Sequence, residues 1–449
     1  MRGNGVTELR DLSRPTEPSS SYLDALRDRT AERAARAEAL TSPHRGAAPE
    51  LASAVASAVQ ERSAAIAALS RRIFGTPEEA FREHHSAAAI AGAVRAEGWD
   101  AAVGVFGQPT AVLAQAGRPD GPAIAILAEY DALPGIGHGC GHNIIAASAV
   151  GAFLAVASVA DRLDGRIVLL GTPAEEGNSG KELLARAGAF DGLDAAIMAH
   201  PFGYDAADHP FIGRRILRVH YAGVAAHASA TPFMGRNALD AATLHYQAVA
   251  QLRQHLPPGD RVHGIVLHGG DRPSIVPASA TLEYYLRSHE AATLRELSTR
   301  LREISEGVAL ATGTGVRLEW DPQPYTLPTR FNRPLTERWA VHQEQVGRRV
   351  LTRDVVPSEL AASTDFGNVS VRVPGIHPVI AVSPPEVALH TEEFARYASS
   401  AAGDRAAVDA AHGLALTALD FLTDPALREA AAADFAAAGG RLDVEGYFS

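Results

Sequence analysis

Short apolar segments alternate with helical segments in the first half of the chain, and this alternation constrains the fold more than any other feature. Residues 110–116, 123–128 and 166–170 form apolar runs of the length expected for buried strands. A helix is expected over 143–160 and a further strand over 195–199. Strands and helices that alternate in this way are typical of an α/β fold with a mostly parallel sheet.

A different order of elements occupies residues 212–322. The sequence there predicts a β-α-β-β-α-β unit, with strands at 216–221, 262–267, 280–286 and 316–320 and helices at 237–256 and 291–311. Such a unit can fold as a small ferredoxin-like α+β domain. The first pattern then resumes with a strand at 378–382 and a helix at 402–421. The small domain is therefore expected to be inserted into the larger one.

This order predicts the domain boundaries. Residues 46–211 and 323–449 are expected to form one discontinuous domain, and residues 212–322 the inserted domain. Residues 1–45 are a polar extension with a helix of mixed charge at 22–40, either a disordered tail or an arm that packs on a partner subunit. Helices are also expected at 50–73 and 84–97.

The overall composition narrows the partners and the compartment. The net charge is −11 and no basic run is interleaved with aromatic residues, which disfavours nucleic acid as a partner. No stretch approaches the roughly 18 apolar residues of a membrane span, and the N-terminus has no apolar signal-peptide core. A single cysteine, Cys140, excludes a disulfide framework and suits a reducing compartment. We therefore expect a cytoplasmic protein.

Side chains that can bind metal follow four of the predicted strands. The strand at 123–128 precedes Asp131 and a glycine-rich loop, and the other three precede a carboxylate or a histidine. In order along the chain these side chains are Asp131, Cys140, His142, Glu175, Glu176, His200 and His390. Ligand sites of open α/β sheets lie beyond the carboxyl ends of the strands. The sequence therefore predicts one site that collects these residues.

The segment from His138 to Asn143 reads His-Gly-Cys-Gly-His-Asn. Glycines let the backbone fold tightly, so that Cys140 and His142 can point at one object. A sulfur and an imidazole suit a transition metal such as zinc. Two other interpretations remain at this point: Cys140 as a small buried hydrophobic residue, or as a nucleophile paired with His142, which the short spacing disfavours.

Glu175 and Glu176 are adjacent in a loop that follows Gly-Thr-Pro. Neighbouring side chains diverge in an extended loop, so one can bind metal while the other takes a proton from water that the metal has activated. The alternative is a solvated surface corner. Their place at a strand end favours the catalytic interpretation.

Five separated motifs resemble those of the M20 metallopeptidases. They are Ala128–Pro134, His138–Asn143, Gly171–Gly177, Met198–Pro201 and Ser363–Ser370. The Cys-Gly-His triplet resembles the amidohydrolase subgroup of this family that carries the same triplet, and in particular the branch with aminobenzoyl-glutamate hydrolases and Xaa-Arg dipeptidases. The resemblance runs from about residue 50 to residue 420.

The resemblance implies a site with two divalent metal ions, zinc or manganese, with cobalt also possible. The implied metal ligands are Cys140, His142, Glu176, His200 and His390. It also implies that Glu175 is the general base and that Asp131 orients a ligand. The wider family has a histidine two residues before that aspartate, whereas this chain has Glu129.

The inserted domain resembles the family's lid and dimerisation domain, which implies a homodimer. His227 matches a lid histidine that polarises the substrate carbonyl, often in the partner's site; otherwise it is an ordinary loop histidine. Arg287 matches an arginine that holds the substrate carboxylate, or it is a surface cation. Ser274 stands where related lids carry an asparagine, and Asn143 is a further candidate substrate contact.

These features together predict a hydrolase that cleaves an amide bond in a dipeptide or an N-acyl amino acid. An aminobenzoyl-glutamate or N-carbamoyl substrate is an alternative. Two further interpretations come from other classes: a non-catalytic metal-binding scaffold subunit, and a thiol-dependent hydrolase that uses Cys140. The intact pair of Glu175 and Glu176 argues against both.

Overall fold

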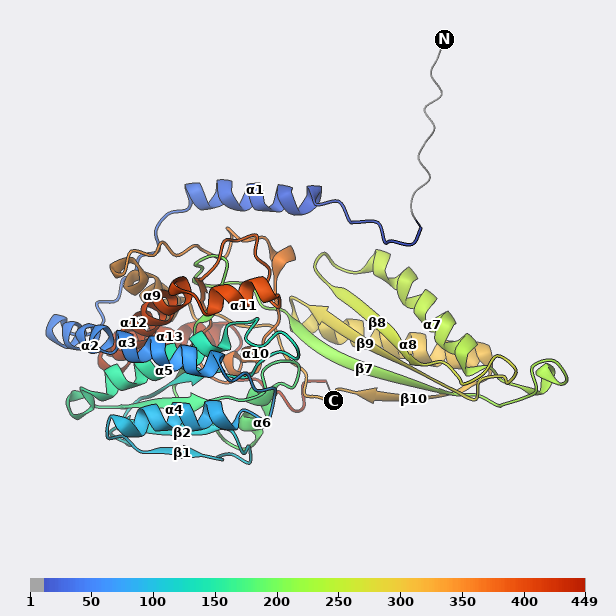
Figure 1. The fold of residues 1–449 in the computed structure, drawn as a ribbon, viewed down its shortest axis with the longest axis horizontal. Helices are drawn as coiled ribbons and strands as arrows, with labels where there is room; N and C mark the ends of the chain where they lie inside the picture. Colours follow the sequence, from blue (N-terminus) through green and yellow to red (C-terminus); the bar gives the residue numbers. More distant parts are fainter. Residues whose placement is uncertain (1–11, 449) are drawn as a thin grey trace, which may run out of the picture.

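The computed structural model describes residues 12–448 and has two lobes (Figure 1). The larger lobe contains a six-stranded sheet in the order β1-β2-β4-β3-β5-β11. Its strands are β1 (Ala101–Val103), β2 (Val112–Gly117), β3 (Ala123–Ala128), β4 (Arg166–Gly171), β5 (Ala195–Ile197) and β11 (Gly375–Ile376). Strands β4, β3, β5 and β11 are parallel, which confirms the predicted α/β class with a mostly parallel sheet.

One predicted strand runs against the others. β2 pairs antiparallel with both β1 and β4. Only residues 118–122 connect β2 to β3, whereas a parallel connection needs a crossover of a dozen residues or more. The short connection therefore forces the reversal, and the sheet has an antiparallel edge.

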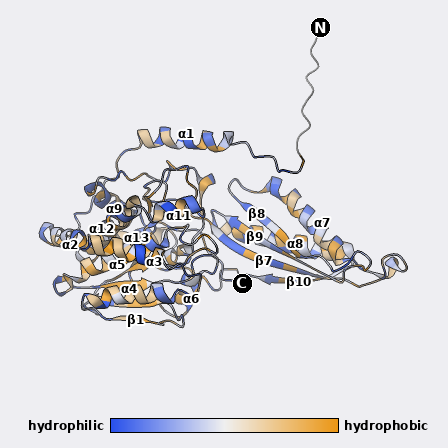
Figure 2. Ribbon diagram, in the orientation of Figure 1, coloured by the Kyte–Doolittle hydropathy of each residue, from blue (hydrophilic) through white to orange (hydrophobic). Residues whose placement is uncertain are grey.

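Helices cover this sheet and bury it. α5 (His142–Ala157) is buried along its whole length and packs against β3, α3 (Ser63–Phe74) and α12 (Ala401–Thr423). Figure 2 shows the apolar residues concentrated in the sheet and in these helices. The remaining helices of the lobe are α2 (Pro49–Glu61), α4 (His84–Ala96), α6 (Gly180–Arg186), α9 (Arg333–Gln345), α10 (Phe366–Ser370), α11 (Glu392–Ala398) and α13 (Pro425–Ala437).

The single helix expected over 50–73 is two helices. α2 ends and α3 begins at Arg62, whose φ of −91° and ψ of 2° leave the helical region. The Arg62 guanidinium bonds to the Ala58 carbonyl at 2.9 Å and to Glu97 at 2.8 Å. Neither glycine nor proline marks this break in the sequence.

The predicted strand over 195–199 is also divided. β5 ends at Ile197, and His200 begins a second short strand, β6 (His200–Phe202). β6 pairs with β12 (Val379–Ala381) in a separate two-stranded parallel sheet. His200 therefore lies inside a strand, and the strand expected at 378–382 lies outside the main sheet.

The smaller lobe is built on a four-stranded antiparallel sheet in the order β10-β7-β9-β8. Its elements are β7 (Gly213–Ala222), α7 (Ala238–Leu252), β8 (Arg261–His268), β9 (Ser279–Ser288), α8 (Ala291–Thr312) and β10 (Gly315–Trp320). Alternate residues of β9 from Ala280 to Leu286 are buried under the two helices. This lobe has a hydrophobic core of its own, as expected for a ferredoxin-like unit.

The N-terminal segment lies across the larger lobe as α1 (Ser21–Arg36), the helix at the top of Figure 1. Leu26 is its buried residue, and Arg33 donates to the Asp354 carbonyl at 3.0 Å. Residues 1–11 of the expected extension lie outside the described residues. Among residues 12–448, no helix has both the length and the apolar character needed to cross a membrane.

Candidate metal centre

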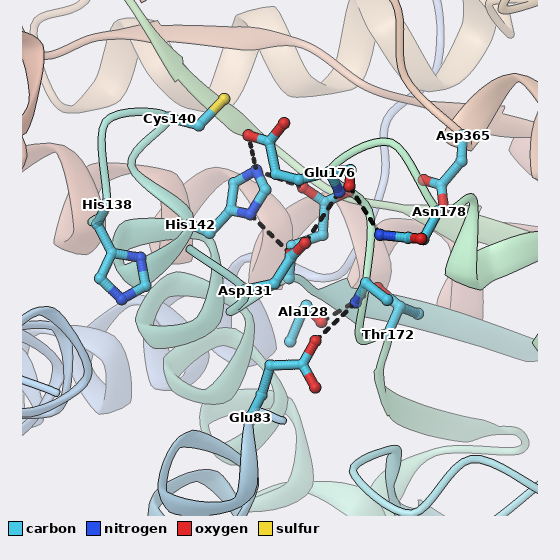
Figure 3. Close-up of polar contacts among 12 residues, drawn as sticks. Glu83, Ala128, Asp131, His138, Cys140, His142, Thr172, Glu176, Asn178 and Asp365 are labelled. Atoms are coloured by element: carbon cyan, nitrogen blue, oxygen red, sulfur yellow. Dashed lines mark hydrogen bonds and ion pairs between the residues drawn. The ribbon is translucent and has the colours of Figure 1, made fainter. Parts of the chain in front are cut away.

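Asp131 organises the first part of the site. The two residues before it, Glu129 and Tyr130, directly follow β3, and all three side chains are buried. One Asp131 oxygen lies 2.9 Å from Nδ1 of His142, and the other accepts from the Glu176 backbone N–H at 2.9 Å (Figure 3). These bonds fix the His142 ring and leave Nε2 without a hydrogen bond, 3.4 Å from a carboxylate oxygen of Glu129. A carboxylate on the other ring nitrogen is the arrangement found in carboxylate–histidine–metal sites.

The glycine-rich loop brings Cys140 to the same place. Gly141 has a φ of +77°, and a Cβ atom there would lie 2.7 Å from the ring of Pro201, so the turn requires glycine. The Cys140 sulfur lies 3.5 Å from Nε2 of His200. Nδ1 of His200 lies 2.8 Å from the Pro201 carbonyl oxygen, to which it donates. The lone pair of Nε2 therefore faces Cys140.

Two loop residues with positive φ hold the remaining donors. Ala174, just before Glu175, has a φ of +61°, and its N–H donates at 2.9 Å to Glu83. His390 also has a φ of +61°, and its N–H donates at 2.9 Å to the carbonyl of Gly139. Non-glycine residues in this region are strained and concentrate at functional sites. Here the strain coincides with the two loops that carry ligand candidates.

The donor atoms form overlapping groups. Within each of three sets the atoms lie within 4.8 Å of one another: Cys140 with His142 and His200; Cys140 with Glu176 and His390; His142 with Glu175 and Glu176. The first two sets share Cys140. All five ligands implied by the resemblance, and Glu175, are thus brought together.

Unsatisfied buried atoms test whether this set fits a metal. Nε2 of His142 and Oε1 of Glu176 are buried and make no hydrogen bond; their nearest ionisable neighbours are Glu129 and His390, each at 3.4 Å. Buried polar atoms are costly without a partner. One sulfur, three imidazoles and carboxylate oxygens are the donor set that zinc and neighbouring transition metals prefer. The residues present therefore fit divalent metal ions.

Burial and neighbouring charges tune Glu175. Its pKa is raised well above its usual value, first by burial and then by the carboxylates of Glu129 and Glu176. A carboxyl group of raised pKa is suited to accept and return a proton near neutral pH. Burial also raises the pKa of the Cys140 thiol, which disfavours a thiolate nucleophile in the absence of metal.

A buried charge network beside the donors was not predicted. Lys181, the one lysine of the chain, is fully buried; its ammonium contacts Glu129 and lies 2.6 Å from Asp365. Lys181 thus balances the buried charge of Glu129, the residue expected to differ from the histidine of the resembling family. Glu83 was also missed, although it supports Ala174 and accepts from Thr110 at 2.8 Å.

A pocket of about 350 Å³ opens beside the donors. Arg287 lines it, as expected for a substrate contact, and so does Arg214, which was not predicted. A larger hollow of about 790 Å³ lies between α1 and residues 352–359 and contains none of the donor residues. We assign the substrate to the smaller pocket because the chemistry lies there.

Asn143 does not line this pocket. Its side-chain amide is fully buried and donates to Ser70 at 2.8 Å and to the Ala398 carbonyl at 3.1 Å. These bonds tie α5 to α3 and to the end of α11. We therefore correct the expected substrate contact to a structural role.

His227 lies in the loop after β7, and Ser274 lies in the loop between β8 and β9. Both loops are at the end of the smaller lobe that points away from the larger lobe (Figure 1). β7 begins beside the pocket at Arg214 and ends at Ala222, which a strand rise of about 3.3 Å per residue places roughly 25 Å away. His227 is exposed, and its Nδ1 accepts from the Ala230 N–H at 3.2 Å. The Ser274 carbonyl accepts from the Ala228 N–H at 3.0 Å. The structure does not bring either residue to the pocket of its own chain.

Comparison with known proteins agrees with this geometry. Residues 125–412 match the family model described as peptidase family M20/M25/M40. The chain is 36% identical over 442 residues to the Xaa-Arg dipeptidase of Mus musculus, covering 94% of this chain and 96% of the relative. It is 30% identical over 433 residues to a p-aminobenzoyl-glutamate hydrolase subunit of Escherichia coli K12, covering 79% and 89%.

Solved structures show the same fold. A dinuclear metal-binding M20 peptidase from Bacillus subtilis superimposes with a TM-score of 0.59 at 19% identity, covering 80% of this chain and 99% of that one. An aminobenzoyl-glutamate utilization protein from Klebsiella pneumoniae gives a TM-score of 0.58 at 20% identity, covering 78% and 96%. The chain belongs to peptidase family M20/M25/M40, and it is a metal-dependent hydrolase of amide bonds.

Proposed function

We propose that this enzyme binds two divalent metal ions, of the zinc or manganese type, and cleaves dipeptides or N-acyl amino acids. The observation that carries this proposal is the pair of donor sets that share Cys140. One set supplies His142 and His200, and the other supplies Glu176 and His390. The B. subtilis relative is itself described as a dinuclear metal-binding peptidase. Bound there, divalent ions would act as Lewis acids and make water in the site more acidic.

Glu175 is the general base and then the general acid. Its carboxylate lies beside the donors His142 and Glu176, where it can take the proton from the attacking water and deliver it to the nitrogen of the leaving amine. Asp131 does not touch substrate; it holds the His142 ring and the Glu176 backbone at once. Arg287 lies at the pocket wall and binds the carboxylate of the leaving residue.

His227 acts in the site of a second subunit. β8 is an edge strand that exposes Ile265, Val266 and Leu267, which are between 46% and 58% exposed. An apolar, unpaired edge strand is a ready pairing surface. We infer a homodimer joined through this lobe, in which the outward Nε2–H of His227 donates to the scissile carbonyl oxygen in the partner's pocket. The single cysteine is free, which suits a cytoplasmic location.

Metal counting tests the proposal. Wild type and Cys140→Ser, each loaded with Zn²⁺ or Mn²⁺, are compared by elemental analysis and by titration of metal affinity. We expect two ions per wild-type chain, with both lost or weakened in the variant because Cys140 belongs to both sets. One ion per wild-type chain, or unchanged affinity in Cys140→Ser, contradicts the shared-ligand arrangement.

A further inference from the structure

Two arginines face each other across the strands that form the wall of the pocket. Arg214 of β7 is the direct register partner of Arg287 of β9, and both line the pocket. Their guanidinium carbons lie 5.4 Å and 5.1 Å from the ring centre of Tyr285. Like charges placed directly opposite each other destabilise a sheet. The pair therefore needs a compensating interaction.

Both guanidinium groups make a cation–π contact with Tyr285, but neither has an acidic partner within the described part of the chain. Across residues 12–448, no carboxylate lies within 4.0 Å of either guanidinium. Arg214 contacts only neutral oxygens, such as Ser179 Oγ at 3.2 Å and the Gly177 carbonyl at 3.4 Å, and its Nε is buried without a partner. Burial and the nearby Arg214 lower the pKa of Arg287.

The lack of an acidic partner is not a general property of the arginines on β7. Arg215 pairs with Asp321 at 2.6 Å, and Arg218 pairs with Glu283 at 2.6 Å. Of the arginines on β7 and β9, all within the described residues, Arg214 and Arg287 at the pocket are the two without an acidic partner. Arg214 is buried and Arg287 is half-buried. A cation removed from water without an acidic partner is costly, and an anionic ligand reduces both that cost and the mutual repulsion.

The acidic residues that line the pocket already have other partners. Glu175 and Glu176 belong to the metal site, and Asp365 is held by Lys181. A cationic side chain on the leaving residue would therefore meet two arginines and no free carboxylate among the described lining residues. A carboxylate side chain would meet a complementary charge.

We propose that the pocket selects a leaving residue with two carboxylates, an acidic amino acid such as glutamate or aspartate, and that Arg214 binds the side-chain carboxylate. This inference rests on the proposed function, in which Arg287 binds the α-carboxylate. It makes Arg214 a specificity-determining residue. It also separates this chain from a preference for a basic leaving residue, which the name of the mouse relative indicates for that protein.

Matched substrates and ligands test the inference. The metal-loaded enzyme is assayed with 4-aminobenzoyl derivatives of glutamate, glutamine and lysine, which share one acyl group. We expect kcat/KM for the glutamate compound to exceed that for glutamine by about 10- to 100-fold, as for charged hydrogen bonds. Arg214→Gln should remove this preference, so that the ratio of kcat/KM between the glutamate and glutamine compounds falls to about one. Arg218→Gln, on the same face of β7, should keep the preference.

Other results overturn the inference. A wild-type preference for lysine does so, and so does a parallel loss for all substrates in Arg214→Gln, which would indicate that Arg214 only holds the loop of Gly177 and Ser179. If no compound is hydrolysed, the proposed function fails, and calorimetric binding of free glutamate and glutamine still decides the inference. Tighter binding of glutamate to wild type, but not to Arg214→Gln, supports it; equal binding contradicts it.

Discussion

The metal centre and the tip of the smaller lobe differ in how completely their own chain satisfies them. At the centre, each donor loop is held by a contact from elsewhere in the chain: Asp131 holds His142 and Glu176, and Gly139 holds His390. At the tip, the segment between β7 and α7 exposes His227, Phe233 and Met234, the last two at 74% and 64%. The metal centre is therefore complete within one chain, whereas the tip is an exposed surface that can contact a second chain.

The largest effect should come from removing the base at the metal centre. Glu175→Gln keeps the size of the side chain but cannot accept the proton, so kcat should fall by about 10²- to 10⁴-fold. Metal content should stay at the wild-type value, because the two sets that share Cys140 do not include Glu175. Steady-state kinetics with elemental analysis checks both, and near wild-type turnover in this variant would remove Glu175 from the chemistry.

A second large effect should come from the tip, although it is roughly 25 Å from the pocket of its own chain. His227→Ala should lower kcat by about 10²- to 10³-fold, the usual cost of one oxyanion donor. Metal content and thermal stability should not change, because the His227 side chain is exposed. An unaffected kcat would make His227 an ordinary loop residue and would contradict a catalytic role for the tip.

A change that weakens the support of a metal ligand should affect activity less than removal of the base. Asp131→Asn keeps a bond to His142 but weakens its orientation and its charge, so metal affinity should fall by about 10- to 100-fold. Activity should recover at saturating metal, whereas Glu175→Gln should not recover. Metal titrations of activity distinguish the two variants, and loss of activity that excess metal cannot restore would assign Asp131 a direct chemical role.

Acid should weaken the lobe that carries the tip. His245 of α7 is buried against the Tyr221 hydroxyl at 3.1 Å, and burial lowers its pKa to about 4. In the unfolded chain the imidazole takes up a proton near pH 6.5, whereas in the folded chain it stays neutral until about pH 4. The free energy of unfolding therefore falls as the pH is lowered from about 7 toward 4. We expect His245→Gln to lose about 2 kcal/mol less than wild type between pH 8 and pH 5. Urea unfolding at both pH values measures this, and identical pH dependence in the two proteins would contradict it.

Much of the metal centre could be predicted because its donors follow apolar runs. The runs at 123–128 and 166–170 fix where strands end, and residues just beyond them converge at one edge of the sheet. Sequence does not indicate which distant side chains meet there. Glu83, Lys181 and Arg214 act through partners far along the chain, so nothing local marks them.

Most other differences between the predicted and the observed structure also come from contacts between distant residues. The reversal of β2 depends on a connection of five residues, 118–122, which is visible in the sequence once the strand ends are known. The break between α2 and α3 falls at Arg62, which bonds to the distant Glu97, and no residue in the sequence marks it. Asn143 was expected at the substrate, but its side chain bonds to Ser70 instead. Position along the chain predicts proximity better than it predicts orientation.

The central claim is that one active centre joins the metal site of one chain to the lobe tip of another. Equal amounts of Glu175→Gln and His227→Ala, each nearly inactive alone, are dissociated and reassociated. Because half of the random dimers are mixed and each mixed dimer has one intact centre, about one quarter of wild-type activity should return. If activity stays at the level of the separate variants while mixed dimers form, each chain works alone and the account is contradicted.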